Sequence, residues 1–226
     1  MSMHCNRKPE QYRVFIVDMD GTLYYKRPMQ IKMALQLLGY YCIHLFRLPE
    51  LFMLYDYRKL RDQDALSDQE GFEQIIVRKL SQKYRYSEEK ARQVIDQWIL
   101  TRPLKILYDC RDRQLISFLD KQRSNGKKVL IYSDYPAENK CKALGIQVDG
   151  IYWPDGESIT VLKPSAQGLN HIIHSNQLDR QQILFIGDRQ EKDGACARSA
   201  NVDCFILKKH RSARRAQYKR LMEQEP

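Results

Sequence analysis

Acidic and hydroxyl side chains in this sequence follow short apolar segments that lie far apart along the chain. The apolar segments are residues 13–17, 128–132 and 183–186, and the polar residues that follow them are Asp18 with Asp20, Ser133, and Asp188 with Asp193. If the segments are neighbouring strands of a parallel sheet, their carboxyl ends share one edge and the acids converge there. Clustered carboxylates repel one another unless a cation lies between them, and oxygen ligands without His or thiolate favour Mg²⁺ over Zn²⁺.

A Mg²⁺ ion at such a site also attracts a phosphoryl group, and the surrounding residue types suit phosphoryl transfer. Asp18 is a candidate nucleophile, because a carboxylate can form an aspartyl-phosphate. Asp20 lies two residues on, on the same side of an extended chain, where it can protonate a leaving alkoxide and then activate water. Gly21 permits the sharp turn that brings Asp20 over the pocket. Ser133 and Lys163 are candidates for holding the phosphoryl oxygens.

The apolar segments alternate with helical ones along most of the chain. Short, β-branched, mostly apolar runs are typical of strands covered on both faces, and residues 203–207 form a fourth run of this kind. The predicted intervening helices are 109–123, 136–144, 164–174 and 191–200. This order of elements predicts an α/β fold, with a Rossmann-like, doubly wound parallel sheet.

Residues 26–105 do not follow this alternation and are expected to form a helical insert after the first strand. The predicted helices are 31–40, 49–59, 67–82 and 87–100, the last with a favourable start at Ser87 followed by two acids. The predicted domains are therefore a discontinuous α/β core, 1–25 and 106–226, and an α-helical insert, 26–105. The aromatic residues of the insert are compatible with a helical core, with a surface that contacts substrate, or with a homo-oligomer interface.

The chain resembles the haloacid dehalogenase-like (HAD) superfamily, in its phosphatase-type members. Four motifs match in order: DMDGT at 18–22, Ser133 after a strand, Lys163 in VLKP, and GDRQEKD at 187–193. The first and fourth motifs are specific by themselves, whereas the second and third are single residues that gain weight from the others. The match spans residues 13–207.

The resemblance implies Mg²⁺-dependent phosphoryl transfer on a Rossmann-like core. It makes Asp18 the nucleophile and Asp20 the general acid/base, with Ser133 and Lys163 as phosphate-binding residues. It makes Asp18, the backbone carbonyl of Asp20 and Asp188 metal ligands, supported by Asp193. An insert between the first and second motifs corresponds to what the family calls a C1 cap. Family members that dehalogenate lack an acid at the position of Asp20, which argues against that activity.

These observations predict a Mg²⁺-dependent phosphatase that hydrolyses a small organic phosphate monoester through an aspartyl-phosphate. A phosphomutase of the same fold, acting on a sugar phosphate, uses the same residues and differs in returning the phosphoryl group to the sugar. A third hypothesis is a non-catalytic binding protein that acts through a basic C-terminal tail. Four converging carboxylates argue against this third hypothesis.

Composition limits the remaining alternatives. The 226 residues include 38 Lys and Arg against 28 acids, and seven of the basic residues lie in 208–220, which has no acid. That segment is compatible with a solvated helix, with binding to nucleic acid or an anionic membrane, or with steering of anionic substrates. The absence of a zinc finger or RNP motif argues against nucleic acid. The sequence shows no apolar stretch of about 20 residues, no signal peptide and no CxxC pair, so we expect reduced thiols, no transmembrane segment and a cytoplasmic protein.

Overall fold

The computed structural model describes residues 9–61 and 71–222, which divide into two compact units. The first unit comprises Met1–Lys26 with Cys110–Pro226, and the second comprises Arg27–Asp109. Helix α1 leaves the first unit and helix α6 returns to it. Each unit has its own buried core.

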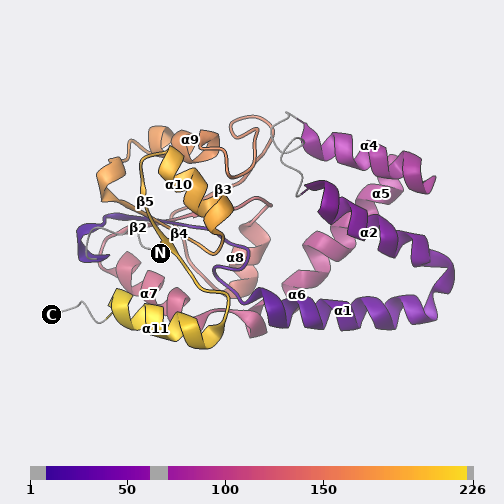
Figure 1. The fold of residues 1–226 in the computed structure, drawn as a ribbon, viewed down its shortest axis with the longest axis horizontal. Helices are drawn as coiled ribbons and strands as arrows, with labels where there is room; N and C mark the ends of the chain where they lie inside the picture. The colour runs from indigo at the N-terminus through magenta and orange to yellow at the C-terminus, as the bar shows by residue number, and fades with distance from the viewer. Residues whose placement is uncertain (1–8, 62–70, 223–226) are drawn as a thin grey trace. The chain divides into compact units, whose positions relative to one another are not determined.

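The first unit is built on a parallel sheet of five strands in the order β3-β2-β1-β4-β5 (Figure 1). The strands are β1 (Val14–Val17), β2 (Lys128–Tyr132), β3 (Gly150–Tyr152), β4 (Ile183–Gly187) and β5 (Asp203–Ile206). β1 pairs with β2 on one side and with β4 on the other, with Val17 level with Ile131 and Ile186. From β1 the chain adds β2 and β3 on one side of the sheet and then β4 and β5 on the other. Ligands of such sheets bind at the carboxyl ends of the strands, near the point where this order reverses.

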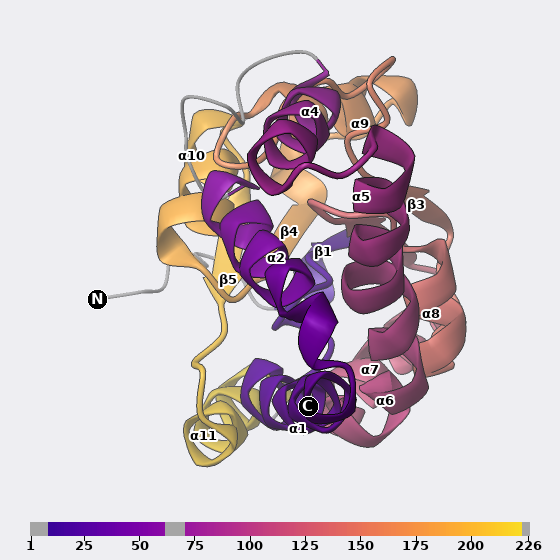
Figure 2. The ribbon, with the colours of Figure 1, turned by 90° about the vertical axis from the view of Figure 1, so that its right-hand side faces the viewer.

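Helices cover both faces of the sheet (Figures 1 and 2). Alternate residues of β1 point to opposite faces, so Ile16 packs in the cluster with α9 and α10, while the Phe15 ring meets Phe118 of α7 edge to face at 5.6 Å. α11 packs beside α7. The helices are α7 (Arg113–Ser124), α8 (Glu138–Leu144), α9 (Gln167–Ser175), α10 (Ala195–Ser199) and α11 (Arg211–Met222). The predicted α/β Rossmann-like sheet is thus confirmed.

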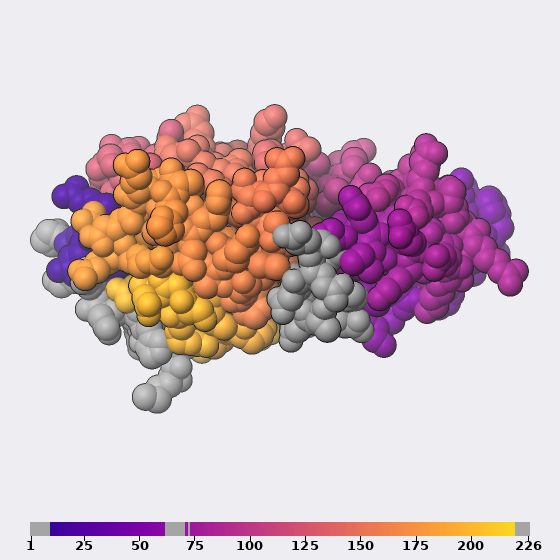
Figure 3. Space-filling view, turned by 90° about the horizontal axis from the view of Figure 1, so that it is seen from above, coloured from indigo at the N-terminus to yellow at the C-terminus, as the bar shows by residue number. Residues whose placement is uncertain are grey.

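The second unit is helical. Its helices are α1 (Lys26–Ile43), α2 (Leu48–Arg61), α4 (Phe72–Tyr84), α5 (Glu88–Ile95) and α6 (Arg102–Cys110). Trp98, in the π-helical segment η3 (Asp96–Thr101), is buried in this unit, with the Tyr41 ring stacked on it at 5.8 Å. In the space-filling view, purple atoms of α2 form part of the surface of this unit (Figure 3).

Several predicted helix boundaries were wrong. The helix predicted for 109–123 is two helices, because Asp112 leaves the helical conformation and its carboxylate accepts the backbone N–H of Leu115 at 3.3 Å, which starts α7. α6 and the short strand β3 were not predicted. The predicted start of a helix at residue 67 lies outside the described residues. Ser87 caps α5 as expected, with its hydroxyl accepting from the backbone N–H of Lys90.

Among the described residues, no helix has both the length and the apolar character needed to cross a membrane.

Candidate functional site

Asp18 lies one residue beyond β1, at the carboxyl edge of the sheet. Its backbone N–H donates to the Ile186 carbonyl at 2.8 Å, and its carboxylate accepts from the Thr22 hydroxyl at 2.9 Å and from Lys163 Nζ at 2.5 Å. Burial raises the pKa of Asp18 to about 7; Lys163 opposes this rise, and the neighbouring Asp193 and Asp188 add to it. The Asp18 carboxylate is therefore held in position by Thr22 and Lys163 at a buried site that disfavours its charged form.

Lys163 joins two of the predicted acids. Its ammonium donates to Asp18 Oδ1 and, at 2.8 Å, to Asp193 Oδ1, with the side chain fully enclosed. Burial opposes the charge on Lys163, but the two carboxylates outweigh it and raise the pKa of Lys163 well above its ordinary value. Lys163, which was predicted from the VLKP motif, is therefore a cation at the centre of the site.

Both carboxylate oxygens of Asp193 accept hydrogen bonds. Its Oδ2 accepts the backbone N–H groups of Asp188 and Arg189 at 3.1 and 3.0 Å, while Oδ1 accepts from Lys163. Burial raises the pKa of Asp193, but Lys163 and the two N–H donors outweigh burial, so the pKa lies below its ordinary value. Asp193 is thus a carboxylate that shapes the loop after β4.

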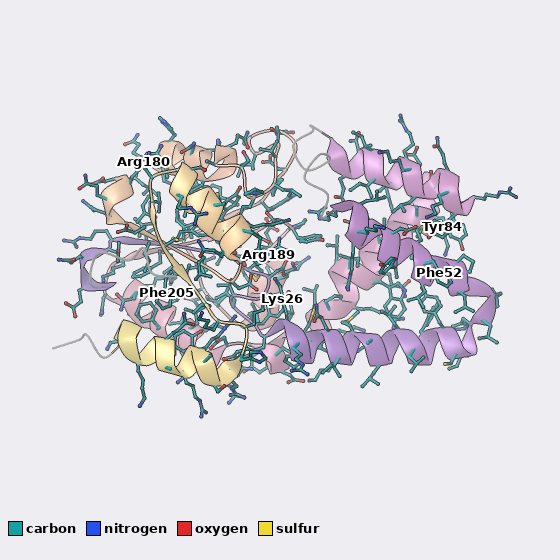
Figure 4. All side chains as sticks on the ribbon, viewed as in Figure 1. Lys26, Phe52, Tyr84, Arg180, Arg189 and Phe205 are labelled. Carbon is teal, nitrogen blue, oxygen red and sulfur yellow. The ribbon has the colours of Figure 1, made fainter. Side chains whose placement is uncertain are left out.

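Asp188 follows β4 and is paired with a lysine that the sequence analysis did not single out. Lys26 Nζ donates to its two oxygens at 3.1 and 3.3 Å; Lys26 is labelled in Figure 4. Burial raises the pKa of Asp188, and Lys26 only partly opposes this. Lys26 is close in sequence to the DMDGT motif, but this proximity gives no signal for its contact with Asp188, which is 162 residues away.

Gly21 allows Lys26 and Asp188 to approach the loop after β1. Its φ is +94°, and an added Cβ would lie 2.4 Å from Asp188 Oδ2 and 2.5 Å from Lys26 Cε. The glycine is therefore required both by its backbone conformation and by the space that its neighbours occupy.

Gly21→Ala is expected to lower the free energy of unfolding more than Gly126→Ala does. Gly126→Ala is the control that isolates the effect of the close contacts. Gly126 also has a positive φ, +78°, but nothing lies within 4 Å of an added Cβ there. Gly126→Ala should cost roughly 1 kcal/mol from backbone strain alone. Gly21→Ala should cost at least about 2 kcal/mol more, because Asp188 must move. Equal midpoints for the two variants in urea denaturation would contradict this account.

Asp20 turns toward a different set of partners. Its carboxylate accepts from Lys140 Nζ at 2.7 and 2.8 Å and from the Tyr24 hydroxyl at 2.5 Å. Burial raises the pKa of Asp20, but Lys140 and Tyr24 outweigh it, so the pKa lies below its ordinary value. Lys140 is on α8 and was not predicted as a site residue; its 120-residue separation from Asp20 leaves no sequence signal.

Ser133 is fully buried directly after β2, the strand beside β1. Its backbone N–H donates to the Tyr152 carbonyl at 3.0 Å, and its hydroxyl accepts the backbone N–H of Tyr135 at 3.1 Å. The hydroxyl therefore has a local capping interaction, which leaves its proton available as a donor.

The acids at this edge form a set that fits a divalent cation. Oxygens of Asp18, Asp188 and Asp193 lie within 4.8 Å of one another, and all three residues are buried. These three carboxylates share only two ammonium groups, because Lys163 contacts Asp18 and Asp193 and Lys26 contacts Asp188. Oxygen ligands of this kind suit a hard cation.

A buried arginine of α11 supports the loop that carries Asp18 and Asp20. The Arg214 side chain is enclosed and donates to the carbonyls of Gly21 and Thr22, the latter at 3.0 Å. It also donates to Asp112 at 3.0 Å, which accepts from the Tyr218 hydroxyl at 2.7 Å. At least one residue of the basic segment 208–220 is therefore part of the core.

Arg214→Lys is expected to lower the free energy of unfolding by about 2–4 kcal/mol, since one ammonium cannot replace a guanidinium that serves several acceptors. Arg215→Lys is the matched control, because Arg215 is the next residue of α11 and is exposed. Its unfolding midpoint in urea should stay within about 0.5 kcal/mol of the wild type. A similar small effect at Arg214 would show that the buried contacts do not hold the loop.

The chain matches a model of a known protein family. The family model of haloacid dehalogenase-like hydrolases matches residues 12–201. No curated protein matches the chain. The family match covers all six predicted site residues and ends before α11.

Solved structures share the fold at low sequence identity. A 2-haloacid dehalogenase from Pseudomonas syringae pv. Tomato DC3000 has a TM-score of 0.58 and 16% identity, with 87% of this chain and 86% of that one covered. The HAD-hydrolase YfnB of Bacillus subtilis, solved with magnesium bound, has the same TM-score and identity, with 87% and 88% covered. A protein described as a β-phosphoglucomutase from Thermotoga maritima has a TM-score of 0.53 and 13% identity, with 86% and 85% covered.

Proposed function

The chain belongs to the haloacid dehalogenase-like hydrolase family, and on that premise we propose that it is a Mg²⁺-dependent phosphatase of small organic phosphate monoesters. The observation that carries the proposal is the buried cluster of Asp18, Asp188 and Asp193 around which Lys163 and Lys26 supply too little positive charge. A carboxylate at the end of a central strand, with a fixed orientation, is the nucleophile that such a reaction requires.

Mg²⁺ would be held by the carboxylates of Asp18 and Asp188 and by the backbone carbonyl of Asp20, with Asp193 in support. When bound, it would neutralise the charge of the phosphoryl group and of the carboxylates around it. Lys26 already neutralises part of Asp188, so we expect its ammonium to shift when the ion is present.

The chain's own residues account for the transfer steps. Asp18 attacks phosphorus in line with the ester oxygen, and an aspartyl-phosphate forms as the phosphorus–oxygen bond to the leaving group breaks. Lys163 remains beside the attacked group and stabilises the charge that develops on the phosphoryl oxygens. The Ser133 hydroxyl donates to one of these oxygens. Water then attacks the intermediate and releases inorganic phosphate.

Asp20 would protonate the leaving alkoxide in the first step and accept a proton from water in the second. The structure has it as a carboxylate bound by Lys140 and Tyr24. Proton donation requires a protonated carboxyl, so our proposal includes release of Asp20 from Lys140 before the first proton transfer. The helical insert 26–105 would act as the cap that selects the substrate.

The proposal is tested by phosphate release from a broad panel of phosphorylated metabolites, including a generic aryl phosphate, with and without Mg²⁺. We expect turnover with Mg²⁺ and its loss in EDTA, with recovery when Mg²⁺ is restored. Full activity in EDTA would refute the metal requirement. If an isomerised sugar phosphate accumulates in place of inorganic phosphate, the chain is a phosphomutase. Salt-sensitive nucleic-acid binding without any turnover would favour a binding protein instead.

A further inference from the structure

Helix α11 is the last element of the described chain, and it lies outside the residues that the family model matches. Its residues Arg214 and Tyr218 are each 1% exposed, and they share one side of the helix because they are four residues apart. A buried guanidinium is costly unless its donors are paired. The acceptors of Arg214 therefore show what this helix holds in place.

The guanidinium of Arg214 reaches two segments of the core unit that are distant in sequence. It donates to the carbonyls of Gly21 and Thr22, the latter at 3.0 Å, and to Asp112 Oδ2 at 3.0 Å. Its Nε donates to the carbonyl of Lys208, just before α11, at 2.6 Å. A planar group with five donors in a fixed geometry can serve all of these acceptors at once. Arg214 therefore joins the loop after β1 to Asp112.

Asp112 belongs to the segment through which the chain returns to the core unit. Two backbone hydrogen bonds of 2.8 and 2.9 Å and one antiparallel bridge pair residues 23–25 with residues 110–112. The guanidinium carbon of Arg214 also lies 4.9 Å from the centre of the Tyr25 ring, within the range of a cation–π contact. The segments by which the chain leaves and re-enters the core are thus paired with each other, and Arg214 contacts both.

The loop that Arg214 contacts carries the predicted nucleophile. Thr22, whose carbonyl accepts from Arg214, donates its hydroxyl to Asp18 Oδ2 at 2.9 Å. The backbone N–H groups of Thr22 and Leu23 donate to the Met19 carbonyl at 3.3 and 3.2 Å, which closes the turn. A single residue therefore lies between Arg214 and the Asp18 carboxylate.

We propose that Arg214 is a positioning residue for phosphoryl transfer, because it holds the loop after β1 in the conformation that directs Asp18 toward the phosphoryl group. Asp112 holds Arg214 in turn, and the Tyr218 hydroxyl donates to Asp112 at 2.7 Å. A displacement of about 1 Å at a reacting group can lower a rate by roughly a hundredfold. The kinetic effect rests on the proposed phosphatase activity, whereas the fixing of the loop does not.

Gln217→Ala is the matched control for Arg214→Lys, since Gln217 joins the same helix to a different part of the core. Its side-chain amide donates to the carbonyl of Ile206 in β5 at 2.9 Å and accepts from the backbone N–H of Lys208 at 2.7 Å. The loss of these contacts should destabilise α11 without moving the loop after β1. The two variants therefore separate positioning of the loop from attachment of the helix.

The kinetic test is hydrolysis of p-nitrophenyl phosphate at saturating Mg²⁺, at a temperature where circular dichroism shows each protein to be fully folded. Arg214→Lys should lower kcat at least about tenfold and leave KM within about threefold, because Ser133 and Lys163 belong to other segments. Gln217→Ala should keep kcat within about twofold of the wild type. Tyr218→Phe removes one hydrogen bond to Asp112 and should lower kcat about threefold, so it provides the test if Arg214→Lys does not fold.

The second test, amide hydrogen exchange followed by NMR, does not depend on turnover. It compares the N–H groups of Thr22 and Leu23 with that of Leu207, which donates to the Gly187 carbonyl at 2.8 Å. Arg214→Lys should speed exchange at Thr22 and Leu23 at least about tenfold more than at Leu207, because the loop opens locally. Gln217→Ala should instead speed exchange more at Leu207.

The proposal is overturned if the folded Arg214→Lys protein, or Tyr218→Phe in its place, has the kcat of the wild type. It is also overturned if exchange at Thr22 and Leu23 rises no more than at Leu207, or if Gln217→Ala lowers kcat as much as Arg214→Lys does. If the wild type shows no turnover, the phosphatase proposal fails, and the exchange measurement alone decides whether Arg214 holds the loop.

Discussion

Asp18→Asn is expected to lower the hydrolysis of an aryl phosphate by at least about a thousandfold, because the amide cannot attack phosphorus. The variant should remain folded, since asparagine has the shape of aspartate and its Oδ1 can still accept from Lys163. The measurement is phosphate release at saturating substrate and Mg²⁺. Asp179→Asn is the matched control, because Asp179 is exposed and caps the short segment before β4. Its turnover should equal that of the wild type.

Asp18→Asn is expected to raise the stability of the protein, although it lowers activity. Burial raises the pKa of Asp18 to about 7, so between about pH 4 and 7 the folded chain binds more protons at this group than the unfolded chain. The free energy of unfolding of the wild type in EDTA should therefore fall as pH rises through this window, by up to about 1.4 kcal/mol per pH unit. Asp18→Asn lacks this titration and should be the more stable protein at pH 8. A wild type that is more stable than the variant at pH 8 would contradict the assigned charge balance.

Lys163→Met is expected to have the second largest effect, on stability as well as on activity. The change leaves Asp18 and Asp193 buried without the ammonium that lies 2.5 and 2.8 Å from their oxygens. Removing one partner of a buried ion pair costs about 3–5 kcal/mol, and we expect a loss of this size in urea denaturation with EDTA present. Turnover should fall by about a hundredfold or more, because the charge developing on the phosphoryl group loses its fixed cation.

Lys142→Met is the control for Lys163→Met, since Lys142 is an exposed lysine of the same core unit. It should match the wild type in both measurements. Added Mg²⁺ should restore part of the stability of Lys163→Met, because a second cation can occupy the carboxylate cluster. If Lys163→Met unfolds at the same urea concentration as the wild type, Lys163 does not neutralise the cluster.

The sequence was sufficient for the fold class and the family. Buried parallel strands are nearly continuous apolar runs, so β1, β2, β4 and β5 are visible as local patterns. β3 was not predicted, because it has only three residues and each of them is half-buried. The sequence also identified the residues that follow β1, β2 and β4. They lie at the carboxyl edge of the sheet, because each comes directly after the end of its strand. The functions assigned to those residues remain predictions.

Only the tertiary structure decided which cations meet these acids. Lys140 pairs with Asp20 across 120 residues, and Lys26 with Asp188 across 162. Arg214 reaches the carbonyl of Thr22 across 192 residues, in a segment whose composition predicts only a solvated basic helix or a binding tail. A local pattern records whether a residue is on a strand, a helix or a loop. Ion pairs between distant segments depend on the packing of the whole chain, and a single sequence contains no local signal for them.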